Sequence, residues 1–259
     1  MLIFYMTLVE FSNSGLFSVF LVFSRVGSAF MFIPAIGETS VPTMVKVIFA
    51  GAVSLLIFSS MPNNILFPDS VISIAALLFG EISIGIMIGL TTKFIISAVH
   101  VFGLVMATQS GLASAMLFDP AQATQGSLFG NFFTILAIML ILSLDLHLVI
   151  ISGLADTYKH LPIGGFAQHF ESFSELIIRS ASSAFITGVK MSLPFLVVSL
   201  MLFLGVGILA KLIPQLQVFS LIFPIQIIIN VLVFIFILSS LSMWFVDYYQ
   251  EQLSQIYGS

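Results

Sequence analysis

The chain has 259 residues, of which 59% are hydrophobic and only 7% are charged. A soluble domain carries roughly 25% charged residues, so seven basic and eleven acidic side chains are too few to cover a water-soluble fold of this length. This composition excludes a soluble globular enzyme, a disordered chain and a nucleic-acid-binding protein, which would show basic clusters. The chain is therefore predicted to be an integral membrane protein.

Seven apolar runs follow one another along the chain, most of them near or above the roughly 20 residues that a helix needs to cross a bilayer. In chain order they are Phe17–Ile36, Val45–Met61, Val71–Leu90, Ile95–Leu117, Phe132–Ala155, Leu176–Leu209 and Val218–Phe245. Such continuous runs differ from the short alternating strands of a membrane barrel. The sequence therefore predicts an all-α fold of six to seven apolar helices.

Polar residues and prolines interrupt several of these runs. Gln109 lies inside the fourth run, and Gln226 and Asn230 lie in the first half of the last one. Lys190 and Pro194 stand near the centre of the sixth run, which is too long for one simple span, and they predict a break or a hairpin there.

The sequence carries almost no residue pattern that is typical of a catalytic site. The chain has no H-E-x-x-H, G-x-S-x-G or phosphate-loop pattern, and no cysteine. Its four histidines do not have the spacing of metal ligands. We therefore expect neither enzymatic activity nor a bound metal or cofactor.

Five charged residues lie within or beside the apolar runs. Each costs roughly 2.5–3.5 kcal/mol at the centre of an inserted helix, so it normally faces protein or water and finds a partner. An ion or proton path is one interpretation. Because both signs are present without regular spacing, buried ion pairs that fix helix packing or subunit docking are favoured. The five residues are Arg25, Glu81, Asp145, Lys190 and Lys211.

Small residues recur at helical spacing and predict places where helices approach closely, because small side chains let backbones meet in the absence of a hydrophobic driving force. These residues are Gly85, Gly89, Gly103, Ala107, Gly126 and Gly130.

The segment from Gln109 to Gln125 changes character along its length. It begins as apolar helix, becomes rich in small residues, and turns polar after Asp119-Pro120. Irregular backbone at membrane depth must be buried in protein or line a cavity, because lipid offers its amides no partners. Small residues with apolar tips suit the closing of a pore by exclusion of water. An ordinary surface loop between two helices is equally compatible with the composition.

Five motifs in order resemble the FliR/SctT family of type III export-gate proteins over essentially the whole chain. After Arg25 in the first apolar run, they are Ser40-Val-Pro-Thr-Met-Val-Lys46, Gly111-Leu-Ala-Ser-Ala-Met-Leu-Phe-Asp-Pro120, Asp156-Thr-Tyr-Lys-His-Leu-Pro-Ile-Gly164, Ser192-Leu-Pro194, and Lys211-Leu-Ile-Pro-Gln-Leu-Gln-Val-Phe219 with Phe223-Pro224. No single motif is specific for this family, but the order and spacing of the five motifs together are.

This resemblance implies a subunit that assembles with FliP and FliQ, beside FlhB and FlhA, into a closed gate in the bacterial inner membrane at the flagellar basal body. Unfolded flagellar proteins would pass through this gate. The resemblance also implies a single family domain, with a FliP-like part over about residues 1–175 and a FliQ-like helical hairpin over about residues 176–259.

The resemblance further implies a plug, a loop that closes the channel at rest. Its residues here are Gly111, Leu112, Ala113, Ser114, Ala115, Met116, Leu117, Phe118, Asp119, Pro120, Ala121 and Gln122. The methionine ring of such gates belongs to FliP, so Met106 and Met116 do not inherit that role.

Three alternatives remain open. One is the corresponding subunit of a virulence injectisome. Another is a secondary transporter of a small solute, which would use Glu81, Asp145 and a break at Pro194 as a site at the membrane midplane. The third is a structural membrane scaffold in which the loop around Asp119 is inert.

Overall fold

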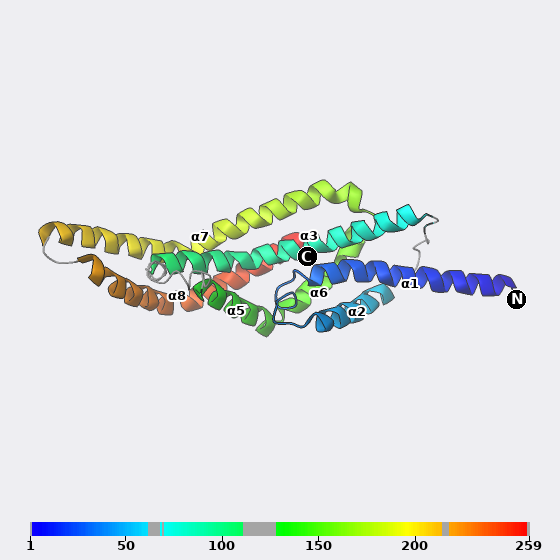
Figure 1. Ribbon diagram of the computed structural model, residues 1–259, viewed down its shortest axis with the longest axis horizontal. Coiled ribbons are helices and arrows are strands. Elements are labelled where there is room, and N and C mark those ends of the chain that lie inside the picture. The colour runs from blue at the N-terminus through cyan, green and yellow to red at the C-terminus, as the bar shows by residue number, and fades with distance from the viewer. Residues whose placement is uncertain (1, 62–67, 69, 111–127, 214–217, 258–259) are drawn as a thin grey trace. The chain divides into compact units, whose positions relative to one another are not determined.

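The computed structural model describes residues 2–61, 68, 70–110, 128–213 and 218–257, and in this part of the chain it contains seven helices and no strand (Figure 1). The all-α prediction is confirmed. The helices are α1 (Leu2–Phe30), α2 (Thr43–Ser59), α3 (Val71–Gln109), α5 (Leu128–Ser143), α6 (Leu146–His160), α7 (Phe166–Leu212) and α8 (Val218–Tyr257).

Among the described residues, three helices are long and apolar enough to cross a membrane: α3, α7 and the Pro224–Tyr257 part of α8. Helices α5 and α6 together could make a fourth span, although they meet at an angle of 74°. The bend falls where the sequence places Asp145, which adopts a left-handed backbone conformation with φ of 56°. These lengths and compositions agree with the predicted membrane protein.

The predicted boundary between the third and fourth apolar runs is wrong, because α3 continues through it for 39 residues. The Thr91 and Thr92 hydroxyls donate to the carbonyls of Met87 and Ile88, at 2.8 and 3.0 Å. Polar side chains that bond back to their own helix need no break in the backbone. The Thr-Thr-Lys sequence therefore stays helical instead of forming a connection.

The predicted break at Pro194 is also wrong, because α7 runs continuously over 47 residues with this proline inside it. A proline lacks the amide hydrogen that would bond to the carbonyl four residues earlier, here that of Lys190. Long apolar helices tolerate this loss where neighbouring groups compensate for it. One hydrogen bond is thus missing, but the helix does not end.

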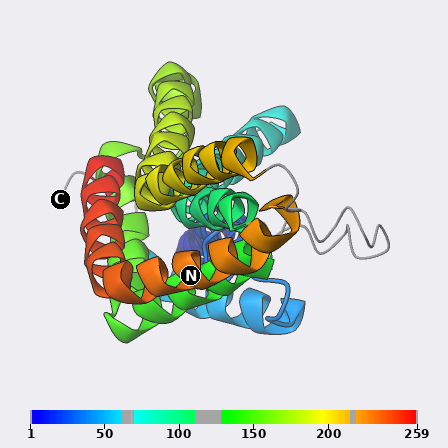
Figure 2. The same ribbon diagram turned by 90° about the vertical axis from the view of Figure 1, so that its left-hand side faces the viewer.

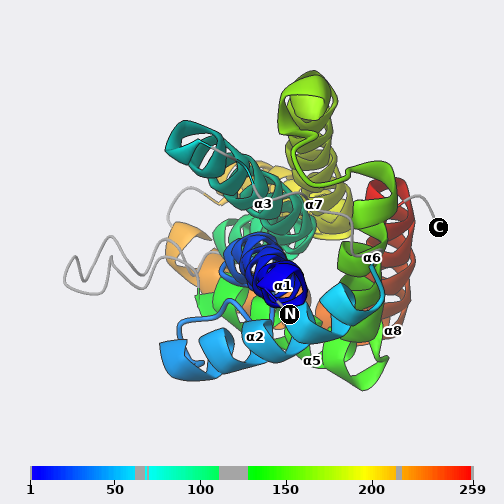
Figure 3. The same ribbon diagram turned by 90° about the vertical axis from the view of Figure 1, so that its right-hand side faces the viewer.

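The chain divides into two compact units, and helices α3, α7 and α8 contribute to both. Unit 1 comprises Met1–Lys93, Asp145–Ser180 and Leu253–Ser259. Within it α1 and α2 lie side by side (Figure 3), and the rings of Phe30 and Phe49 stack at 5.3 Å between centroids. In unit 1, α1 and α2 therefore pack against each other.

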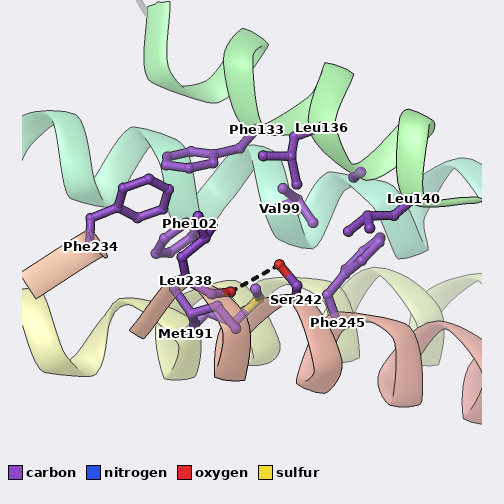
Figure 4. A pocket seen from close by; sticks show the side chains of 12 residues that line it. Val99, Phe102, Phe133, Leu136, Leu140, Met191, Phe234, Leu238, Ser242 and Phe245 are labelled. Atoms are coloured by element: carbon purple, nitrogen blue, oxygen red, sulfur yellow. Dashed lines mark hydrogen bonds between the residues drawn. The ribbon is translucent and has the colours of Figure 1, made fainter. Parts of the chain in front are cut away.

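Unit 2 comprises Phe94–Leu144 and Ala181–Gln252, and its core is aromatic. The Phe133 ring lies 4.8 Å from that of Phe102 and 5.1 Å from that of Phe234, between centroids. The side chains in this core leave a cavity of only about 30 Å³ (Figure 4). A cavity this small and apolar indicates close packing of α3, α5, α7 and α8.

Candidate functional site

Arg25 and Glu81, two of the five predicted charges, form an ion pair inside unit 1. Arg25 Nε donates to Glu81 Oε2 at 2.7 Å, and Arg25 Nη2 donates to Glu81 Oε1 at 3.1 Å. Neither side chain is exposed at all. This two-pronged geometry matches the planar guanidinium fork to the carboxylate and links α1 to α3.

The remaining donors of Arg25 reach the end of α6. Its Nη1 donates to the carbonyl of Leu161 at 3.1 Å and to the Thr157 hydroxyl at 3.4 Å. The guanidinium carbon also lies 3.9 Å from the ring centroid of Tyr158, which is a cation–π arrangement. The charge that α1 carries into the interior is therefore shared among three helices.

The turn between α6 and α7 completes this cluster through a glycine. Gly164 has φ of +87°, a backbone conformation that residues other than glycine rarely adopt. Its amide donates to Glu81 Oε1 at 3.3 Å. The Pro-Ile-Gly-Gly sequence of this turn therefore supplies a backbone donor to the buried carboxylate as well as a change of direction. We call Arg25, Glu81, Thr157, Tyr158 and Gly164 the unit 1 polar cluster.

Gly85 and Gly89, predicted as packing residues, face α1 one and two turns beyond Glu81. A Cβ on Gly85 would overlap Ser28 Oγ and the Arg25 carbonyl, and one on Gly89 would lie 2.7 Å from the carbonyl of Ala29. Only glycine permits this approach of the two backbones. The close contact brings α1 near enough for Arg25 to reach Glu81.

Gly103 and Gly130 meet in the same way in unit 2. A Cβ on Gly103 would lie 2.5 Å from the Cα of Gly130, so α3 and α5 touch through their backbones. Ala107, one turn further along α3, is half-buried. Gly126 lies outside the described residues.

The other three predicted charges have a different setting. Asp145, Lys190 and Lys211 are exposed, and within the described part of the chain none of them lies within 4.0 Å of an oppositely charged group. Asp145 stands at the bend between α5 and α6, and the two lysines lie on α7. The structure therefore brings together two of the five charges and leaves three on the surface.

The predicted plug, Gly111–Gln122, lies entirely outside the described residues. The described helix before this segment, α3, ends at Gln109, and the described helix after it, α5, begins at Leu128. Both helix ends belong to unit 2.

The sequence interpretation missed a second polar cluster, at the end of α3. The carbonyl of Gln109 accepts hydrogen bonds from Ser199 Oγ at 3.0 Å, from Asn230 Nδ2 at 3.2 Å and from Gln226 Nε2. Figure 2 shows this end of α3 between α7 and α8. We call these four residues the α3-end cluster. The sequence signal was the pair of amides four residues apart in the last apolar run, which share one helix face.

Metal binding has no candidate in the described part of the chain, where no group of three or more His, Asp or Glu side chains could hold an ion. The two polar clusters have few ionisable members. What they offer is a fixed set of hydrogen bonds between helices, in a chain whose exterior is largely apolar.

Comparison with known families gives one match, to the bacterial export proteins, family 1, over residues 16–252. This match spans nearly the whole described chain, including both polar clusters.

Three relatives illustrate the similarity, and each is a flagellar biosynthetic protein FliR. The protein of Escherichia coli K12 is 34% identical over 200 residues, covering 76% of this chain and 75% of its own. That of Bacillus subtilis 168 is 29% identical, covering 86% and 87%. That of Caulobacter vibrioides is 25% identical, covering 90% and 93%.

Proposed function

Because the chain belongs to the bacterial export proteins, family 1, we propose that it is a non-enzymatic gate subunit of a flagellar type III protein-export channel. The family match over residues 16–252 is the observation that carries this proposal, together with relatives that are flagellar biosynthetic proteins. The proposed location is the bacterial inner membrane at the flagellar basal body. The three to four membrane-length helices of the described part of the chain support a place in a membrane.

The proposed partners are FliP and FliQ in the core of the channel, with FlhB and FlhA beside it. The proposed cargo is unfolded flagellar protein. Exposed apolar side chains on the second half of α7 support burial against lipid or sister subunits, since water would not tolerate a patch of this kind. Among them, Leu200, Met201, Phe203 and Leu204 expose between 48% and 64% of their surface. Within this assembly, we assign residues 1–175 to a FliP-like part and residues 176–259 to a FliQ-like hairpin.

The segment Gly111–Gln122 is the proposed plug of the channel. Its composition supports this role, because glycine, alanine and serine permit close contact while Leu112, Met116, Leu117 and Phe118 exclude water. Such a seal yields to a passing chain without the loss of strong bonds. The described helices before and after the segment, α3 ending at Gln109 and α5 beginning at Leu128, both contribute to the closely packed core of unit 2.

A small-solute transporter is the weaker alternative. It would need an available carboxylate and a helix broken at the membrane midplane. Both carboxylate oxygens of Glu81 accept hydrogen bonds from Arg25, which leaves the exposed Asp145 as the other carboxylate of this alternative, and α7 passes through Pro194 without a break. These two observations favour the export-gate proposal.

The test of the plug is deletion of residues 111–122 in cells that make the whole complex, followed by measurement of ion and small-solute leak. A control variant replaces the same residues with a Gly-Ser linker of equal length, which keeps the helix connection but removes the apolar side chains. Both variants are expected to leak while still co-purifying with FliP and FliQ. An assembled complex whose membrane stays tight without these residues would contradict the plug assignment.

A further inference from the structure

The α3-end cluster joins three helices through a single backbone oxygen. Its three donors come from the second half of α7 and the first part of α8. All three side chains are buried: Ser199 and Asn230 are 0% exposed and Gln226 is 1% exposed. All four residues belong to unit 2. Polar groups buried this deeply in an apolar chain are costly, so their convergence on one atom is a specific feature.

The carbonyl of Gln109 is one of the groups that a helix leaves unpaired at its C-terminal end. A carbonyl oxygen has two lone pairs, and here three side-chain donors compete for them. The three described side chains therefore fill the acceptor capacity of this oxygen. The last hydrogen bond of the helix in the described residues runs from the Ser110 amide to the Met106 carbonyl, at 2.8 Å.

Local sequence alone gives a weak reason for α3 to end at Gln109. Gly111 lowers helix stability by only about 1 kcal/mol relative to alanine. The residues after it, Leu-Ala-Ser-Ala-Met-Leu, are mostly good helix formers, and the apolar run itself continues to Leu117. A tertiary contact that occupies the Gln109 carbonyl supplies the missing reason.

The orientation of the two amides supports a fixed arrangement. Both turn their nitrogen toward the Gln109 carbonyl, and the reverse orientation would bring two oxygens together. As a result, Gln226 Oε1 and Asn230 Oδ1 are buried without a hydrogen-bond partner among the described residues. Two acceptors left unpaired cost free energy, and the hydrogen bonds that the two amide nitrogens donate to the Gln109 carbonyl offset part of this cost.

We propose that Ser199, Gln226 and Asn230 are positioning residues, which act as a cap supplied by other helices and fix where α3 ends. The functional part of this inference rests on the proposed function: the α7–α8 pair would thereby set the point from which the plug begins. Loss of the cap would loosen the last turn of α3 and weaken the resting seal.

The test is amide hydrogen exchange over residues 106–110 in the complex purified with its partners. Ser199→Ala and Asn230→Leu each remove one donor and are expected to speed exchange in this turn roughly threefold to tenfold. Ser192→Ala is the matched control. Ser192 is also a fully buried serine of α7, but its hydroxyl donates to Gly188 in its own helix, at 2.8 Å. It should change exchange at this turn by less than about twofold, whereas Ser199→Thr, which keeps the hydroxyl, should restore slow exchange.

The functional readout is ion leak in cells that make the same variants. Faster exchange in both donor variants, with raised leak and a silent Ser192→Ala, supports the inference. Unchanged exchange at residues 106–110 would overturn the cap whatever the leak shows. Faster exchange with a tight membrane would overturn its link to the seal, while the plug itself is judged separately by the deletion of residues 111–122.

Discussion

Replacing Glu81 with glutamine removes one charge of the buried pair and nearly preserves the shape of the side chain. Arginine side chains stay charged in proteins. In this variant Arg25 would therefore lie 0% exposed, with its Nε and Nη2 facing a neutral amide. Arg25→Met makes the complementary change and leaves the Glu81 carboxylate without its cation.

The expected cost of either change is about 3–5 kcal/mol of unfolding free energy, because removal of one partner leaves an uncompensated buried charge. The hydrogen bonds to Leu161 and Thr157 and the contact with the Tyr158 ring still hold Arg25 in the Glu81→Gln variant. These contacts keep the Arg25 guanidinium buried but do not supply a negative charge to balance it. The cost should therefore fall within this range despite the retained contacts.

The measurement is urea denaturation of the purified chain in detergent, followed by helical circular dichroism. An exposed pair of the same residue types on α7 serves as the control: Arg179 Nη2 lies 2.6 Å from Glu175 Oε1, with side chains 78% and 61% exposed. Glu175→Gln should cost at most about 1 kcal/mol, since solvent screens such pairs. The distances are nearly equal, so the comparison sets a buried pair between two helices against an exposed pair within one helix.

The double variant Arg25→Met with Glu81→Leu completes the reasoning. Replacing both charges with apolar groups leaves neither one unpaired, so the loss should be well below the sum of the two single changes. Additive losses, or a Glu81→Gln variant no less stable than Glu175→Gln, would refute the view that burial makes this pair structural.

Two further changes, one in each unit, probe side-chain and backbone packing in the isolated chain by the same denaturation measurement. Gly85→Ala should lower the unfolding free energy by about 1–3 kcal/mol because its Cβ would overlap Ser28 Oγ. Its control, Gly205→Ala, has open space around it and should be neutral or stabilising by up to about 1 kcal/mol. Equal effects of the two changes would contradict the close contact of α1 with α3. Phe102→Ala removes a ring that is 2% exposed and should lower the unfolding free energy by about 3–5 kcal/mol. Its control, Phe236→Ala, removes a ring that is 83% exposed and should lower it by about 0.5 kcal/mol or less. A small loss for Phe102→Ala would mean that the aromatic core is not closely packed.

The fold class could be predicted from composition, but the helix boundaries could not. A charged content of 7% and long apolar runs leave few alternatives to membrane helices. Thr91 and Thr92 look like a connection in the sequence, yet their hydroxyls bond back to the helix. Pro194 looks like a break, yet one missing hydrogen bond does not end a helix as long as α7. These outcomes depend on local compensation that residue type does not reveal.

The candidate sites were partly visible in the sequence. Arg25 and Glu81 stand out as charges within apolar runs, but nothing in the sequence pairs two residues 56 positions apart. Gln226 and Asn230 stand out less, and their partner at Gln109 is a backbone carbonyl, which has no sequence signature. Polar residues in apolar helices could thus be found from the sequence, whereas their partners required the packed helices.

The two polar clusters fix the positions of helices that apolar contacts alone would not fix. Where most side chains are hydrophobic, sliding one helix past another exchanges similar contacts, and lipid competes with protein on equal terms. A buried ion pair between α1 and α3, and a carbonyl held by α7 and α8, each lose their partners if a helix shifts by one turn. Buried polar groups therefore fix the register of helices that burial alone would leave undetermined. In the proposed export gate, a fixed helix register would offset the cost of the amide oxygens that stay unpaired.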